Sequence, residues 1–235
     1  MTKVYGHGRP RKFWKLLSDW QRQALRDIAR PVQYANGVRI CTEGDDSEFA
    51  LVIEVGAVKV FQRRSGRRQE LVAVRTVDDI VGEGIWSEDR RNATLVALHD
   101  VRALRIEADE FGIFLRDFPE VDLALRRAAR DRAEESVHRL LDPRNTTSRR
   151  QLARLMIQQI DSIGIEIQNG SEGYAVDLGL SPAEVGQLIG FSERTVQRAF
   201  ATWREQGLVS TDDRRVIIHD EAGLRRVAFG PAGEE

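Results

Sequence analysis

One face of a predicted helix between residues 193 and 204 gathers side chains that can contact DNA bases. On a helical wheel Glu193, Arg194, Gln197, Arg198 and Arg204 fall on one arc, because residues three and four apart share a helix face. Arg, Gln and Glu are the side chains that pair with guanine, adenine and cytosine edges in the major groove. The pattern therefore predicts base contacts, and an ordinary amphipathic helix with a solvated charged face is the alternative interpretation.

The residues before this helix have the signals of a shorter helix and a tight turn. Ser181 can cap a helix whose first residue is Pro182, where a missing N–H is tolerated. Gly190 is typical of a helix end, and Ser192 can cap the helix that follows. The small Gly186 allows two helices to cross closely. Together these signals predict a helix-turn-helix.

A polar turn with adjacent arginines follows the second helix. Residues 208–210 and 216–219 predict two short strands, and Arg214 and Arg215 lie at or beside the turn between them. This hairpin would be the wing of a winged helix-turn-helix. We expect Glu193, Arg194, Gln197 and Arg198 to face bases. Four other side chains should face phosphates, namely Ser192, Thr195, Arg214 and Arg215.

The middle of the chain predicts a β domain with a ligand site. Between residues 32 and 106, short β-rich segments (38–41, 49–55, 58–61, 70–77, 92–97 and 101–106) are divided by turn residues such as Gly56. Regular short strands of this kind favour a β-sandwich or jelly roll. A polar excursion at residues 86–91, beside Gly82 and Glu83, interrupts the rhythm. We expect a ligand to bind there.

Helices are predicted on both sides of this domain. A capping box at Ser18 starts a short helix that ends before Pro31, after a loose arm over residues 1–12. Residues 108–115 predict another short helix. After the long segment 119–142, the sequence predicts a hinge at 143–148, a helix over 151–165 and a β turn at 170–173.

The long segment 119–142 has a stripe of small and apolar residues. The stripe recurs at helical spacing and consists of Val121, Leu125, Ala129, Ala133, Val137 and Leu140 or Leu141. Such a stripe is typical of a two-helix seam. Packing against the chain's own β domain is an alternative that explains part of it, but a homodimer is the commonest arrangement for a long protruding helix.

Composition limits the class of protein and its partners. The 36 basic and 37 acidic residues give a formal net charge of −1, so any affinity for nucleic acid must come from a local basic patch. Contents of 41% hydrophobic and 31% charged residues are normal for soluble globular proteins. No apolar run approaches about 18 residues, and the first residues lack the apolar core of a signal peptide. We therefore expect a cytoplasmic protein without membrane contact.

The few cysteine and histidine residues argue against metal or redox chemistry. The single cysteine, Cys41, excludes an internal disulfide framework and a four-cysteine iron–sulfur cluster within one subunit, and a buried apolar role is expected. Residues 32–106 contain no H-x-H pair or His/Glu cluster, whereas a catalytic metal site needs about three protein ligands. We expect no metal, no obligatory cofactor and no enzymatic activity.

The order of these parts resembles the bacterial CRP/FNR family of transcription regulators. The strings that carry the resemblance are GDDSEFALVIEVGAVKV (44–60), VGE (81–83), RNAT (91–94) and FSERTVQR (191–198), and it spans about residues 13–229. The resemblance implies an α+β fold with three parts. These are an N-terminal β-roll or jelly-roll domain of the cyclic-nucleotide-binding type (1–118), a dimerisation helix (119–142) and a C-terminal winged helix-turn-helix (143–235).

The resemblance also assigns residues to a ligand. In the family a Gly-Glu pair precedes an Arg-Ser/Thr-Ala string, the Glu binding a ribose hydroxyl and the Arg a cyclic phosphate. These positions are Gly82, Glu83 and Arg91 here, with Asn92 in place of the usual Ser or Thr. Ser136 aligns with a hydroxyl that contacts the base across the dimer. An ion pair within the roll is the alternative for Glu83 and Arg91.

The function implied is that of a dimeric regulator of a palindromic site in double-stranded DNA, with cyclic AMP as a possible effector and RNA polymerase as a possible contact. An effector-independent regulator with a degenerate pocket, and a response to a different small ligand, are alternatives. Glu193 and Arg194 exchange the charges found at these positions in the cyclic-AMP receptor, so we expect a different operator. Two other functions fit the sequence less well. A protein-interaction module would leave the polar arc of the 193–204 helix without a role. A cupin-like metalloenzyme would need metal-binding side chains that residues 32–106 do not provide.

Overall fold

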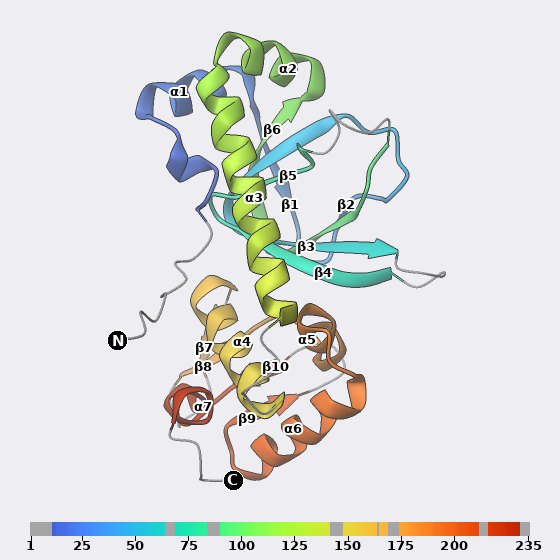
Figure 1. Cartoon of the computed structure of the whole chain (residues 1–235), viewed down its shortest axis with the longest axis vertical. Coiled ribbons are helices and arrows are strands. Elements are labelled where there is room, and N and C mark those ends of the chain that lie inside the picture. Colours follow the sequence, from blue (N-terminus) through green and yellow to red (C-terminus); the bar gives the residue numbers. More distant parts are fainter. Residues whose placement is uncertain are drawn as a thin grey trace.

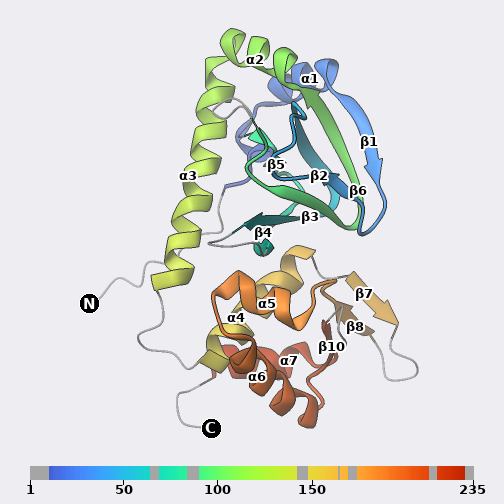
Figure 2. The ribbon, with the colours of Figure 1, turned by 90° about the vertical axis from the view of Figure 1, so that its right-hand side faces the viewer.

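In the computed structural model, a β-roll lies above a smaller, mainly helical unit (Figure 1). The structure describes residues 11–63, 69–83, 90–141, 148–163, 165–168, 174–211 and 216–230. One long helix, α3 (Pro119–Leu141), runs along the side of the roll toward the smaller unit (Figure 2). Strands and helices are thus segregated as the α+β prediction expects. None of the helices in these ranges is long and apolar enough to cross a membrane.

The roll is a six-stranded antiparallel sheet. Its path is β1-β6-β3-β4, with β2 paired to β6 and β5 paired to β3. The strands are β1 (Arg30–Tyr34), β2 (Arg39–Cys41), β3 (Phe49–Arg63), β4 (Gln69–Thr76), β5 (Ile80–Val81) and β6 (Thr94–Glu107). Apolar side chains on the inner face, including Leu51, Val58 and Val101, bury one another and form the core of the roll.

Two strands are longer than the sequence predicts. We expected Gly56 to separate two strands, and residues 92–97 and 101–106 to be separate as well. Instead β3 and β6 are continuous, and they pair with each other through register shifts on either side of Val55. Bulges of this kind bend a strand without ending its ladder, so a local break signal did not end either strand. The short strand β5 was not predicted.

Helices α1 (Asp19–Ile28) and α2 (Ala108–Asp117) cover one end of the roll (Figure 1). The capping box predicted at Ser18 is present: its hydroxyl accepts from the Gln21 amide at 3.4 Å, and its amide donates to Gln21 Oε1 at 2.8 Å. A short 3-10 turn, η1 (Trp14–Leu16), precedes α1. Helix α1 ends at Ile28, before Pro31, as predicted.

The predicted loose arm is held at its last two residues. Arg11 Nε donates to Asp131 Oδ2 on α3 at 2.8 Å, and Lys12 Nζ donates to Asp79 Oδ2 at 2.5 Å. The guanidinium of Arg11 lowers the pKa of the Asp131 carboxyl below its ordinary value. The prediction of a loose arm is therefore wrong for Arg11 and Lys12, while residues 1–10 lie outside the described ranges.

Helix α3 packs one side against the roll. Val121, Leu125 and Ala128 are buried there, together with residues of α1 and α2. The predicted stripe is therefore divided, because Ala129 and Ala133 on a neighbouring side of the helix are exposed. The side chains from residue 135 to the end of α3, including those of Val137, Leu140 and Leu141, lie outside the described residues.

In its described residues, the smaller unit combines four helices with a four-stranded sheet of order β7-β8-β10-β9. The helices are α4 (Ser148–Ile163), α5 (Pro182–Ile189), α6 (Glu193–Glu205) and α7 (Glu221–Phe229). The strands are β7 (Ile165–Gln168), β8 (Tyr174–Asp177), β9 (Val209–Thr211) and β10 (Val216–Ile218). We expected the helix to extend to Ile165, but α4 ends at Ile163 and Ile165 is the first residue of β7. Helix α7 was not predicted. The predicted β turn at 170–173, and all of the predicted hinge except Ser148, lie outside the described residues.

The smaller unit packs directly on the roll through α5. Lys59 Nζ on β3 lies 2.8 Å from Glu184 Oε1, and both side chains are mostly buried, at 13% and 19% exposure. The Leu71 amide on β4 donates to Gln187 Oε1 at 2.8 Å. Ala57, Leu71 and Leu98 of the roll share one hydrophobic core with the smaller unit. This contact therefore combines apolar burial with directed polar bonds.

Candidate functional site

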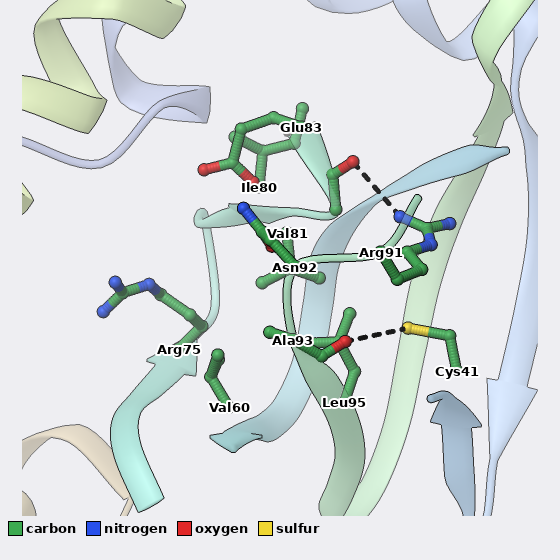
Figure 3. Close-up of a pocket in the computed structure, with 11 residues that line it drawn as sticks. Cys41, Val60, Arg75, Ile80, Val81, Glu83, Arg91, Asn92, Ala93 and Leu95 are labelled. Carbon is green, nitrogen blue, oxygen red and sulfur yellow. Dashed lines mark hydrogen bonds between the residues drawn. The ribbon is translucent and has the colours of Figure 1, made fainter. Parts of the chain in front are cut away.

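An open cavity of about 170 Å³ lies inside the roll, where β5 leads toward β6 (Figure 3). Five of the eleven residues in its wall are aliphatic, namely Val60, Ile80, Val81, Ala93 and Leu95. The remaining lining residues are Cys41, Arg75, Gly82, Glu83, Arg91 and Asn92. Four of the five residues expected to bind a ligand thus line one cavity. The fifth, Ser136, lies on α3, but its side chain is outside the described residues.

Arg91 is a buried cation that the roll holds in place. Its Nε donates to Ser47 Oγ at 3.0 Å, its Nη1 to the Gly82 carbonyl at 3.2 Å and its Nη2 to the Phe49 carbonyl at 2.7 Å. The guanidinium also lies 4.4 Å from the centre of the Phe49 ring. Burial lowers the pKa of Arg91 from its ordinary value, but an arginine remains charged at neutral pH. The cavity therefore has a fixed positive charge.

Gly82 is required for this position of Arg91. Its φ is +82°, and a Cβ atom would lie 2.7 Å from Arg91 Nη1 and 2.8 Å from the Phe49 carbonyl oxygen. Real Cβ atoms do not approach other atoms so closely, so any other residue would displace the guanidinium. The position of the Arg91 guanidinium thus depends on a glycine at residue 82.

Glu83 forms an ion pair with α3. Its carboxylate accepts from Arg132, which is 8% exposed and also donates from Nη1 to the Ile80 carbonyl at 2.9 Å. In Figure 3 the carboxylate of Glu83 points away from Arg91, so the two do not pair, contrary to the alternative considered from the sequence. Arg132 was missed, although a charge within the apolar arc of the 119–142 helix was a signal for it.

Asn92 and Cys41 also line the cavity. Asn92 is exposed, and its backbone carbonyl accepts from Gln62 Nε2 at 3.2 Å. Cys41 is buried, as expected, with Sγ 3.9 Å from the Ala93 carbonyl oxygen. Burial raises the pKa of the Cys41 thiol, and the charge of Arg91 opposes this shift.

Helices α5 and α6 form the predicted helix-turn-helix. Ser181 and Glu184 make a capping box at the start of α5, and Gly190 ends that helix with a φ of +70°. A Cβ at Gly186 would lie 2.9 Å from Val196 Cγ2, which explains the small residue where the helices cross. Sequence signals at the helix ends therefore located both helices correctly.

The two faces of α6 divide as predicted. The buried face consists of Val196, Ala199, Phe200 and Trp203. The exposed face includes Glu193, Arg194, Gln197 and Arg198. Arg204 differs from these, because its Nη1 donates to Thr211 Oγ1 on β9 at 2.7 Å. It joins the helix to the wing.

The start of α6 carries the hydroxyls expected to face phosphates. Ser192 accepts from the Thr195 amide at 3.3 Å, and the two hydroxyl oxygens lie 2.9 Å apart. A helix N-terminus has unpaired N–H groups and a positive dipole end, which suit an anion. Arg214 and Arg215 lie outside the described residues, between β9 and β10. Among the residues that can be located, no cluster of three or more His, Cys, Asp or Glu could hold a metal ion.

The chain matches known families in two separate regions. Residues 31–118 match the cyclic nucleotide-binding domain, which contains the cavity. Residues 150–227 match the Crp-like helix-turn-helix domain, which contains α5 and α6.

Known proteins also match over most of the chain. The chain is 26% identical over 208 residues to the CRP-like cAMP-activated global transcriptional regulator of Mycobacterium tuberculosis, covering 87% of this chain and 91% of that protein. It is 25% identical over 202 residues to the cyclic AMP receptor protein of Thermus thermophilus, covering 85% and 88%. A solved CRP-family transcriptional regulator, also from Thermus thermophilus, has a TM-score of 0.63 at 21% identity, covering 84% of this chain and 96% of that chain. At this identity the structural likeness shows the fold.

Proposed function

Because the chain belongs to the CRP/FNR family of transcription regulators, we propose that it is a homodimeric regulator whose affinity for DNA is set by a cyclic nucleotide in the roll. Residues 1–118 would hold the effector, residues 119–142 would join the dimer and residues 143–235 would bind a palindromic operator. Two relatives are named for cyclic AMP, which makes it one candidate effector. A regulator of this kind acts on DNA in the cytoplasm, where RNA polymerase is a further possible partner, and needs no catalytic activity.

The observation that carries this proposal is that strands β3 and β4 border both sites. Their inner face contributes Val60 and Arg75 to the cavity, and their outer face contacts α5 through Lys59 and Leu71. Side chains of adjacent strand residues point to opposite faces. A ligand that moves these strands therefore changes the contact with the first helix of the helix-turn-helix.

The contacts to a cyclic nucleotide would follow the charges in the cavity. Arg91 would bind the cyclic phosphate through charge-assisted hydrogen bonds. Glu83 would accept from the ribose 2′-hydroxyl while Arg132 holds its carboxylate. Asn92, at the exposed rim, can donate to a phosphate oxygen, and Ser136 would reach the base across the dimer.

Titration calorimetry with cyclic AMP and cyclic GMP tests the effector site. Glu83→Gln keeps the size of the side chain but weakens a charged acceptor, so affinity should fall roughly ten- to a hundredfold. Glu54→Gln, on an exposed part of β3, is the matched control and should bind normally. If the wild-type protein gives no heat with either nucleotide at millimolar concentration, the effector site is refuted.

An effector-independent regulator is the second candidate. The observation that favours it is the set of bonds of Arg91, because the roll already uses three of its five N–H donors. In that case the only role of the Arg91 guanidinium would be to stabilise the roll. DNA binding that is equally tight with and without a nucleotide would support this candidate.

A further inference from the structure

Arg204 is an exposed cation at the C-terminal end of α6. An α-helix rises about 1.5 Å per residue, so Arg204 lies roughly 16 Å along the helix axis from Glu193. In a helix-turn-helix, the residues near the start of the second helix contact the base edges. Base contact therefore does not account for Arg204, although it shares the polar arc with Arg194 and Gln197.

The guanidinium of Arg204 is directed to the wing. Its Nη1 donates to Thr211 Oγ1 on β9 at 2.7 Å. The chain turns between the two residues, where Gly207 has a φ of +69° and the Leu208 amide donates to the Trp203 carbonyl at 2.9 Å. Strand β9 consequently lies beside α6 (Figure 1). The bond from Arg204 to Thr211 closes this turn with side chains.

This bond gives direction to a contact that is otherwise apolar. Trp203 of α6 and Val209 of β9 are buried in the same core, and apolar packing has no preferred direction. Strand β9 lies at the edge of its sheet, where its backbone pairing comes from β10. A hydrogen bond requires a defined distance and angle. Arg204 therefore fixes how the outer end of β9 lies against the helix.

We propose that Arg204 is a positioning residue for DNA binding, which through Thr211 holds the wing at the angle at which it reaches phosphates while α6 contacts bases. This rests on the proposed binding of DNA by α6 and the wing. The turn that follows Thr211 in the sequence contains Arg214 and Arg215, the two wing side chains expected to face phosphates. Phosphate contacts carry no sequence information, so loss of the bond should weaken binding to all duplexes alike.

The test separates this positioning role from a direct contact of Arg204 with DNA. Thr211→Val removes the hydroxyl at nearly constant size, whereas Thr211→Ser keeps it. In fluorescence anisotropy on a duplex enriched from random sequence, Thr211→Val should bind about two- to tenfold more weakly, the usual effect of one hydrogen bond. Thr211→Ser should bind like the wild type. Arg204→Met should show the same loss as Thr211→Val, and the double variant should lose nothing more, because both changes remove one interaction.

The salt dependence gives a readout that a purely structural role would not change. If the wing loses a phosphate contact, the salt slope of the affinity should fall by about one counterion per subunit in Thr211→Val and in Arg204→Met. The preference for the enriched duplex over a single-mismatch duplex should stay the same. Thr202→Val is the matched control, because Thr202 Oγ1 donates to the Arg198 carbonyl within α6 at 3.3 Å. It should change neither affinity nor slope, and melting followed by circular dichroism verifies that each variant folds.

The outcomes separate this inference from the proposal beneath it. A loss of affinity in Arg204→Met with normal binding by Thr211→Val would mean that Arg204 contacts DNA itself, which overturns the positioning role and leaves DNA binding standing. An unchanged salt slope in both variants would overturn the positioning role as well. If the wild-type protein binds no duplex, with or without a cyclic nucleotide, DNA binding and the role of Arg204 fail together.

Discussion

At the scale of single residues, Arg91 is part of the roll as well as of the cavity. Arg91→Ala would leave the buried carbonyl of Phe49 and the half-buried carbonyl of Gly82 without this donor, and an unsatisfied buried polar group costs about 1–3 kcal/mol. We therefore expect the free energy of unfolding to fall by roughly 2–4 kcal/mol without any ligand, as measured by urea denaturation. Arg90→Ala, at a side chain that is 69% exposed, is the control. Equal stability of both variants would mean that the bonds of Arg91 do not support the roll.

The thiol of Cys41 reports on the same cavity. Its pKa is raised by burial, so at pH 8 the reactive thiolate is scarcer than in an ordinary cysteine. Alkylation of the native protein should be slow at pH 8, accelerate as the pH rises beyond the ordinary thiol pKa, and become fast in urea. Because this is the single cysteine of the chain, mass spectrometry gives the rate directly. A native rate equal to the rate in urea would contradict the burial.

The residues of the cavity were only partly predictable from the sequence. Gly82, Glu83 and Arg91 were located by their strings and indeed line one cavity. Two further residues of the site were not predicted: Arg132, the partner of Glu83, lies far along the chain, and Arg75 lines the cavity because of its register with Val58. Neither residue can be placed at the cavity without knowing how the long helix and the two strands pack.

At the scale of elements, the contact of α5 with the roll can be measured by a double-mutant cycle. Lys59→Met keeps the aliphatic stem, and Glu184→Gln keeps the capping box with Ser181. Because the pair is mostly buried, we expect a coupling of about 0.5–2 kcal/mol in the free energy of unfolding. The control pair, Asp122 and Arg126 on α3, is 34% and 74% exposed and should give at most about 0.5 kcal/mol. A coupling at Lys59 no larger than in the control would show that the docking does not depend on this pair.

Elements with signals at their ends were predicted well, and elements defined by distant partners were not. Ser181, Gly190 and Ser192 place α5 and α6 correctly because capping is a local interaction. The continuity of β3 through Gly56 depends on pairing with β6, some forty residues further along the chain. Local sequence contains no record of that pairing.

At the scale of the whole molecule, the exposed side of α3 is where a second subunit would pack. Ala129→Glu combined with Ala133→Glu would place like charges in a dimer seam, and sedimentation should then show monomers. Leu123→Glu, on another exposed side of the same helix, is the control and should leave the dimer intact. Leu125 is unsuitable for this test, because it is buried against the roll. A dimer that persists in the double variant would place the interface elsewhere.

Control of DNA binding by the cavity is tested most directly by the affinity for an operator with and without nucleotide. Fluorescence anisotropy at fixed salt would use a duplex enriched from random sequence, with Arg194→Ala as the variant that lacks one base contact. Saturating cyclic nucleotide should raise the affinity of the wild type for this duplex by roughly 5- to 150-fold. Arg194→Ala should respond to the nucleotide but bind this duplex about 1–3 kcal/mol more weakly. An affinity of the wild-type protein that is the same with and without either nucleotide would contradict the account.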